Sequence, residues 1–274
     1  MAGLPTWGIV CPFSYCCEYS KPFYFQDNIS DCSSQRYDLA GAMVFDSSPR
    51  FGLPGEFVGI FNRSSRGLAP RLHALLVQPI SPTFSAAGQA LRMVSAIADL
   101  INTNSHSASF WKRDTDAIRL IGPCIHFLLS MPRLPSNFEV MADPEDHIAR
   151  EMVRLTCLML MSKLKELFAF PPSEQVSLHA RLAQFMSHNV KTLGRKYFEL
   201  KIWALVTIAL LRYHDGREIY IQEMKKEAFA MDKPTPYEVT EIARDIVWID
   251  VLMSPFSEEL MAEMTPHVAI QGIH

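Results

Sequence analysis

Several side chains in this sequence are of types that could do chemistry, and His147 and Glu151 are the first pair to consider. They stand one helical turn apart, so on a helix they could place two metal ligands on one face. No second pair at matching spacing occurs elsewhere, whereas di-iron helical bundles draw Glu-x-x-His motifs from two helices. The alternative, which we prefer, is a solvated face on which Asp146 pairs with Arg150 and Glu151 with Arg154. It predicts that Glu151→Gln changes stability by less than about 0.5 kcal/mol.

Three further candidates stand singly. Asp250 interrupts the apolar segment WIDVLM. A carboxylate buried there would need a partner and could mark a site. We prefer the alternative that Asp250 faces solvent at the edge of a helix. His126, in PCIHFLLS, is interpreted as a hydrogen-bonded core or boundary histidine rather than a base. The segment from Ser162 to Lys165 fits Ser-x-x-Lys but lacks the partner motifs of the enzymes that use it. We expect it at the exposed end of a helix.

The cysteines raise the question of a zinc site or of disulfides. Structural zinc sites usually take cysteines in close pairs that recur after a spacer, and the first four cysteines do not follow such a spacing. We therefore expect no zinc and reduced thiols, with the last two cysteines as small core residues because both lie in apolar segments. The six residues are Cys11, Cys16, Cys17, Cys32, Cys124 and Cys157.

The usual signatures of an enzyme are missing from the sequence. It contains no dinucleotide-binding glycine motif, phosphate-binding loop, serine-nucleophile elbow or paired-histidine zinc motif. The 14 methionines could line an adaptable pocket, but Met is also an ordinary core residue. We therefore assign no catalytic, cofactor-binding or metal-binding residue, and we expect a protein that is not an enzyme and uses no cofactor.

The composition describes a folded chain with no bulk attraction for nucleic acids. Of its 274 residues, 49% are hydrophobic and 20% are charged, enough for one large domain or two small ones with a real core. The net charge is −3, so we expect no direct sequence-specific DNA binding by this chain. No apolar run approaches the roughly 20 residues of a membrane-spanning helix, and the first residues do not read as a signal peptide. We expect no membrane association.

Helical periodicity dominates from about residue 69 onward. Asp143 suits an N-cap with Pro144 in the first turn, and Thr235 is a second predicted cap. Gly122-Pro123 should break or kink its helix, and Gly194 suits a helix C-cap. The predicted helices cover residues 69–78, 85–102, 115–130, 143–168, 173–193, 197–213, 217–231 and 235–253.

The chain before this region differs, because Pro, Gly, Ser and aromatic residues occur there without a sustained period. We predict an irregular segment over residues 1–68, with at most a short strand or helical turn near residues 57–61. By contrast, residues 197–213 are apolar on nearly every side, which implies a helix surrounded by others and a buried Trp203. The sequence therefore predicts an all-α fold, either a multi-helix bundle or stacked helical hairpins, over residues 69–274.

Four short motifs follow one another in order over residues 147–253: Arg154-Leu155-Thr156, Lys201-Ile202-Trp203-Ala204-Leu205, Arg217-Glu218-Ile219-Tyr220 and Val247-Trp248. Their order resembles the fungal-specific transcription factor domain, the helical C-terminal regulatory region of many fungal zinc-cluster regulators. That family has an Arg-Leu-Ala-like helix, a Leu-Leu-Trp-x-Leu helix, an Arg-x-Trp-Phe helix and a final helix ending in Leu-Trp. Ile219 and Tyr220 stand where the family has Trp and Phe.

The resemblance implies a transcription regulator of fungal type in the nucleus, with residues 69–274 as its helical regulatory domain. The family's six-cysteine zinc cluster, which contacts DNA, has no counterpart in the spacing of the cysteines here. The implied role is therefore binding of a DNA-bound regulator, of a second copy of the chain, or of a small-molecule effector. The alternative is a helical ligand-binding or scaffold protein with no catalytic activity. A pocket with convergent polar groups would favour ligand binding, and a large exposed apolar patch would favour a scaffold.

Overall fold

The computed structural model describes residues 38–52, 68–77, 81–112, 114–170, 173–211, 216–230 and 235–265. Every regular element within these ranges is a helix, so the predicted all-α fold is confirmed. Besides a helix at residues 38–45, the α-helices are α2 (Pro70–Val77), α3 (Pro82–Asn104), α4 (Asp114–Ser130), α5 (Pro144–Leu167), α6 (Gln175–Asn189), α7 (Phe198–Leu210), α8 (Arg217–Ala230), α9 (Pro236–Arg244), α10 (Asp250–Met253) and α11 (Ser257–Met264). Within the same ranges, no helix combines the length and the hydropathy that crossing a membrane requires. The strand or turn predicted near residues 57–61 lies outside the described residues.

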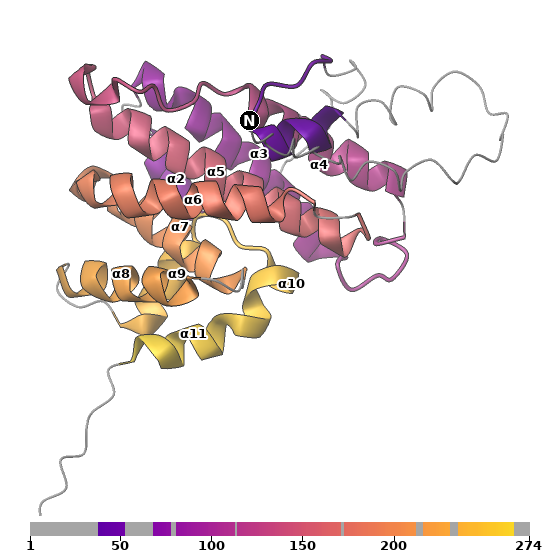
Figure 1. Cartoon of the computed structure of the whole chain (residues 1–274). Coiled ribbons are helices and arrows are strands. Elements are labelled where there is room, and N and C mark those ends of the chain that lie inside the picture. The colour runs from indigo at the N-terminus through magenta and orange to yellow at the C-terminus, as the bar shows by residue number, and fades with distance from the viewer. Residues whose placement is uncertain are drawn as a thin grey trace, which may run out of the picture.

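Two helices organise the packing. α5 contacts α3, α4, α6 and α7, and α7 in turn contacts α8, α9, α10 and α11. In Figure 1, α6 and α7 lie between the helices α3, α4 and α5 and the helices α8 to α11 that follow them in the chain. One hydrophobic cluster includes buried residues from all of these helices, so they share a single core.

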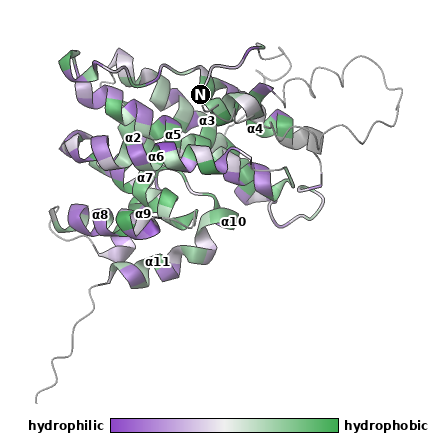
Figure 2. Cartoon of the chain, in the orientation of Figure 1, coloured by the Kyte–Doolittle hydropathy of each residue, from purple (hydrophilic) through white to green (hydrophobic). Residues whose placement is uncertain are grey.

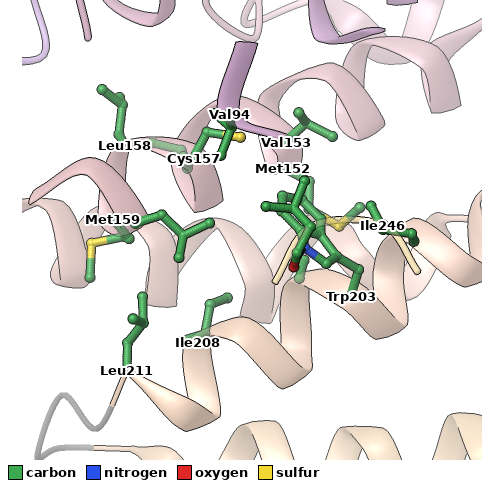
Figure 3. Close-up of a cluster of buried hydrophobic side chains, with 14 of the residues drawn as sticks. Val94, Met152, Val153, Cys157, Leu158, Met159, Trp203, Ile208, Leu211 and Ile246 are labelled. Atoms are coloured by element: carbon green, nitrogen blue, oxygen red, sulfur yellow. Dashed lines mark hydrogen bonds between the residues drawn. The ribbon is translucent and has the colours of Figure 1, made fainter. Parts of the chain in front are cut away.

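α7 is the most enclosed helix. All of its residues from Leu200 to Leu210 are buried, and Figure 2 shows it mostly in the colour of apolar residues. Trp203 has no exposed surface and lies near Met152 of α5 and Ile246 in the cluster of Figure 3. Its indole Nε1 donates a hydrogen bond to the carbonyl oxygen of Val247 at 3.1 Å. The predicted burial of Trp203 is confirmed, as expected for a helix that is apolar on all sides.

Local capping fixes several helix starts. Ser81 Oγ accepts a backbone N–H in the first turn of α3 at 3.3 Å. At α9 the predicted cap is a complete capping box: Thr235 Oγ1 accepts from Glu238 N at 3.2 Å, and the Glu238 carboxylate accepts from Thr235 N at 2.6 Å. α5 begins directly after Asp143, as predicted. The Asp143 side chain makes no capping hydrogen bond, and its backbone is left-handed with a φ of 54°.

Two predicted boundaries differ from those of the structure. α4 continues through Gly122 and Pro123, so of the predicted break or kink the break does not occur. α6 ends at Asn189, and Gly194 lies beyond it rather than at its cap. The Gly194 N–H donates to Glu145 Oε2 at 3.2 Å, and an added Cβ would lie 3.1 Å from Glu145 Oε1. The glycine therefore permits a close approach instead of ending a helix.

The single helix predicted over residues 235–253 is also wrong. α9 ends at Arg244, residues 245–249 are not helical, and α10 starts at Asp250. Residues 246–249 are nevertheless buried. The apolar pattern of these residues therefore predicted their burial correctly, but it predicted a helix where the chain is not helical.

Long-range hydrogen bonds explain why this link can leave the helix. The Asp245 carbonyl accepts from the backbone N–H of Leu72 at 3.1 Å. Asn102 Nδ2 donates to the Trp248 carbonyl at 2.9 Å, and Asn102 Oδ1 accepts from the Asp250 N–H at 2.8 Å. A buried backbone group needs a partner, but the partner need not belong to the same helix. These bonds therefore replace helical ones.

Residues 38–45 form a helix inside the segment that was expected to be irregular. Leu39, Ala42 and Met43 are buried in the main core. The helix is followed by Asp46, whose backbone is left-handed with a φ of 49°. This placement brings the Asp46 side chain to α5.

Candidate functional site

The polar face of α5 is buried, so the prediction of a solvated face is wrong. Its residues are between 0% and 8% exposed: Asp146, His147, Arg150, Glu151 and Arg154. Asp146 Oδ1 accepts from Lys196 Nζ at 2.7 Å, and no ion pair joins it to Arg150 within the described part of the chain. The predicted Glu151–Arg154 pair does form. Segments far away in the sequence cover this face, and periodicity within α5 carries no information about them.

Arg154 is the centre of the buried face and has no exposed surface. Its Nε donates to Glu151 Oε2 at 2.9 Å, and its Nη2 donates to Glu151 Oε1 at 2.6 Å. Its Nη1 donates to Asp46 Oδ1 at 2.7 Å, and Nη2 also donates to Asp46 Oδ2 at 3.0 Å. Two carboxylates thus hold one guanidinium, each through two bonds. This geometry is what a buried charge requires.

The ion pairs keep these groups charged. Burial alone would raise the pKa of Asp46, but hydrogen bonds from Arg154 and the charges of Arg154, Arg133 and Arg181 hold that pKa below its ordinary value. Burial alone would lower the pKa of Arg154, but its bonds to Glu151 and Asp46 raise that pKa above its ordinary value. A permanent cation therefore lies inside the molecule, between two anions.

Arg133, in the segment after α4, extends the cluster. Its Nε lies 3.1 Å from Asp46 Oδ1, and its Nη1 and Nη2 donate to the carbonyl oxygens of Met131 and Asp46 at 2.6 and 3.2 Å. Arg150 Nη2 donates to the carbonyl oxygen of Arg133 at 3.1 Å. Burial and the like charge of Arg154 lower the pKa of Arg133 despite the nearby carboxylates. Arg133 therefore lies close to Asp46 and to the like charge of Arg154.

Arg181 of α6 completes the cluster. Its Nη1 donates to the carbonyl oxygen of Met43 at 3.2 Å, and its Nη2 donates to that of Val44. These carbonyls belong to the last turn of the helix at residues 38–45, where a positive charge is favourable. Hydrogen bonds from Arg181 and Arg133 thus hold the turn at residues 43–46 against α5 and α6.

A cleft of about 360 Å³ opens between α5, α6 and this turn. Its walls combine charged and amide side chains with three apolar ones, and the lining residues are Asp46, Arg133, Leu134, Glu151, Leu155, Arg181, Gln184, Phe185, His188 and Asn189. The volume is within the range of small-molecule sites, which place a few polar groups against an apolar surface. We call this site the arginine cleft.

The chemistry available in the arginine cleft is that of binding. Arg133 and Arg181 line the cleft, and Arg150 and Arg154 lie next to its lining residues. These four arginines are near two carboxylates, those of Asp46 and Glu151, so the cluster has two positive charges in excess. Guanidinium groups bind carboxylates and phosphates through paired N–H donors. The site therefore has the groups to hold an anion.

The two residues of the pair first considered, His147 and Glu151, differ in their hydrogen bonding. Glu151 is fully engaged by Arg154, and His147 Nδ1 is buried without a hydrogen-bond partner among the described residues. Within the same part of the chain, no group of three or more His, Cys, Asp or Glu side chains is arranged to hold a metal ion.

Asp250 and His126 take the structural roles that were preferred for them. Asp250 is exposed at the first residue of α10, and its Oδ1 accepts from Ser254 Oγ at 3.0 Å. His126 is half-buried, and its Nε2 lies 2.9 Å from the carbonyl oxygen of Phe51. Neither residue lines the arginine cleft.

The Ser-x-x-Lys segment is not at an exposed helix end, which corrects that expectation. Ser162 is fully buried and donates through Oγ to Glu174 Oε1 at 2.8 Å. Lys165 Nζ donates to the same oxygen at 2.7 Å. Glu174 directly precedes α6 and is itself fully buried. The three side chains form an internal polar contact between α5 and the start of α6.

The two described cysteines are core residues, as predicted. Cys124 and Cys157 are unbonded thiols with no exposed surface. Burial raises the pKa of both thiols, and the neighbouring Cys124 adds to the effect on Cys157. The first four cysteines lie outside the described residues, so the expectation about zinc stays a prediction.

Sequence reasoning missed three of the residues that build the cleft. Asp46 lies in a segment with no periodic pattern, and Arg133 and Arg181 resemble ordinary surface arginines. One signal was present: Glu151 and Arg154 are the only charges between Arg150 and Lys163. A pair of opposite charges inside an otherwise apolar run is typical of a buried ion pair.

Comparisons of the chain with models of protein families, with curated proteins and with solved structures found no match.

Proposed function

We propose that residues 69–274 form a regulatory module in transcription control that works through effector or partner binding rather than direct DNA contact. Its site of action would be the nucleus. The bound species would be a DNA-bound regulator, a second copy of the chain, or a small-molecule effector. The proposal includes no catalytic step and no cofactor.

The observation that carries the proposal is how the motif-bearing segments pack. Leu155 of α5, Trp203 of α7 and Tyr220 of α8, each from one of the motifs, are all buried in one core. Trp203 also bonds to the Val247 carbonyl of the last motif at 3.1 Å. Motifs that resemble a regulatory domain in order are thus also joined in space. The net charge of −3 supports a role without direct DNA contact.

A reporter assay in a fungal host tests this function. The chain is fused to an unrelated DNA-binding domain, and transcription from a matching promoter is measured. The expected result is expression that differs several-fold from that with the DNA-binding domain alone, and a fluorescent fusion is expected in the nucleus. The control is the same DNA-binding domain fused to an unrelated helical protein of similar size. Equal expression from both fusions, with the chain shown to be folded and present, would contradict the proposal.

The arginine cleft supports a second candidate, a helical ligand-binding protein without a role in transcription. Its volume and its arginines suit a small ligand whether or not the chain regulates genes. A silent reporter together with ligand binding by the purified protein would favour this candidate.

A further inference from the structure

We infer that the arginine cleft binds a small organic anion, one with a carboxylate or phosphate group on an apolar body. The inference rests on the proposed function only in treating this anion as the effector. Binding itself is a property of the purified chain.

The sign of the charge is the first argument. Both carboxylates of the cluster are already engaged, since Glu151 bonds to Arg154 through two oxygens and Asp46 bonds to Arg154 and Arg133. Arg181 donates hydrogen bonds to two backbone carbonyls, and its charge contributes to the lowered pKa of Asp46, but no carboxylate forms an ion pair with it within the described part of the chain. An entering cation would meet a net positive charge, whereas an anion would neutralise it.

The available donors are the second argument. A guanidinium has five N–H groups, and the bonds to Met43 and Val44 use two of those on Arg181. Arg133 keeps 28% of its side chain exposed. The two arginines come from different segments but line the same cleft. An anionic group between them can accept charge-assisted hydrogen bonds from both.

The shape of the cleft selects a small ligand. Leu134 and small exposed parts of Leu155 and Phe185 supply apolar atoms beside the arginines, and Gln184 and Asn189 supply amides. A hollow of about 360 Å³ suits a metabolite-sized molecule rather than a folded partner. The apolar surface further favours an organic anion over a simple inorganic one.

Calorimetric titration of the purified full chain tests the inference. The probes are phenyl phosphate and phenylacetate, which carry the two head groups on the same ring, with sodium chloride at equal ionic strength as the reference. Saturable binding of at least one probe is expected. A preference between the probes identifies the head group.

A matched pair of variants locates the site. Gln184→Glu adds a negative charge to an exposed side chain on the cleft wall, and Gln89→Glu makes the same change on an exposed position of α3 outside the lining. Gln184→Glu should weaken binding about tenfold through charge repulsion, and Gln89→Glu should leave it unchanged. Because both positions are exposed, both variants should fold normally.

Three results would overturn the inference: no binding of either probe up to about 10 mM, equal heats with sodium chloride, or binding that Gln184→Glu does not weaken. These results are independent of the reporter assay. Anion binding with a silent reporter would refute the role in transcription alone, and an active reporter without anion binding would refute the inference alone.

Discussion

A guanidinium in a protein interior is stable only when its donors are taken up, and Arg154 meets that condition through Glu151 and Asp46. The energetic consequence is asymmetric. Removing one partner of a buried pair leaves a charge that neither water nor protein fully compensates. Each member of the cluster is therefore expected to matter more than a surface charge.

Glu151→Gln should therefore lower the free energy of unfolding by about 2–4 kcal/mol, because Arg154 loses one of its two anions inside the protein. This replaces the small effect that a solvated face implied. Denaturant melts of the variant measure the change. Glu139→Gln, at an exposed residue, is the control and should stay within about 0.5 kcal/mol of the parent. If both variants melt alike, the ion pair at Arg154 does not contribute to stability.

At the scale of elements, the link between α9 and α10 shows how a side chain can replace helical hydrogen bonds. Asn102, in the last turn of α3, bonds through its amide to the backbone of both Trp248 and Asp250. One side chain thus connects the end of α3 to the link that carries buried Trp248. α3 and the link are far apart in sequence, so the bond fixes tertiary structure rather than a local turn.

Asn102→Ala should cost about 1–3 kcal/mol, because it leaves the Trp248 carbonyl and the Asp250 N–H without their partner. Asn104→Ala is the matched control, since among the described residues the Asn104 amide bonds only within its own helix, to the Leu100 carbonyl. That variant should change stability by less than about 0.5 kcal/mol. Chemical denaturation of both proteins gives the comparison. Equal losses of stability in the two variants would show that the Asn102 hydrogen bonds to the link contribute no more than a hydrogen bond within α3.

At the scale of the whole molecule, α7 joins the two groups of helices. It contacts α5 on one side and α8, α9, α10 and α11 on the others, and its side chains belong to the single core. A defect inside α7 therefore affects both groups at once. We expect the described helices to unfold together rather than one group at a time.

Trp203→Ala should lower stability by about 3–5 kcal/mol, through lost burial and the cavity left behind. Since domains are stable by only about 5–15 kcal/mol, the variant should be marginal or unfolded. Circular dichroism during denaturation should show one transition, shifted to much lower denaturant. Tyr237→Ala, at a residue that is 62% exposed, should change little. A parent-like melt for Trp203→Ala would mean that α7 is not the centre of the fold.

The sequence by itself determined the all-α class, the starts of α5 and α9 after Asp143 and Thr235, and the burial of Trp203. The helical class and the helix starts depend on interactions within a few residues, which periodicity and terminal residues report directly. The burial of Trp203 was predictable because α7 is apolar on every side, so any neighbouring segments must cover it. Only the tertiary structure decided that the polar face of α5 is buried and that residues 245–249 leave the helix. Asp46 reaches Arg154 across 108 residues and Asn102 reaches Trp248 across 146. The burial of a polar face depends on which distant segment covers it, and a local pattern contains no information about that partner.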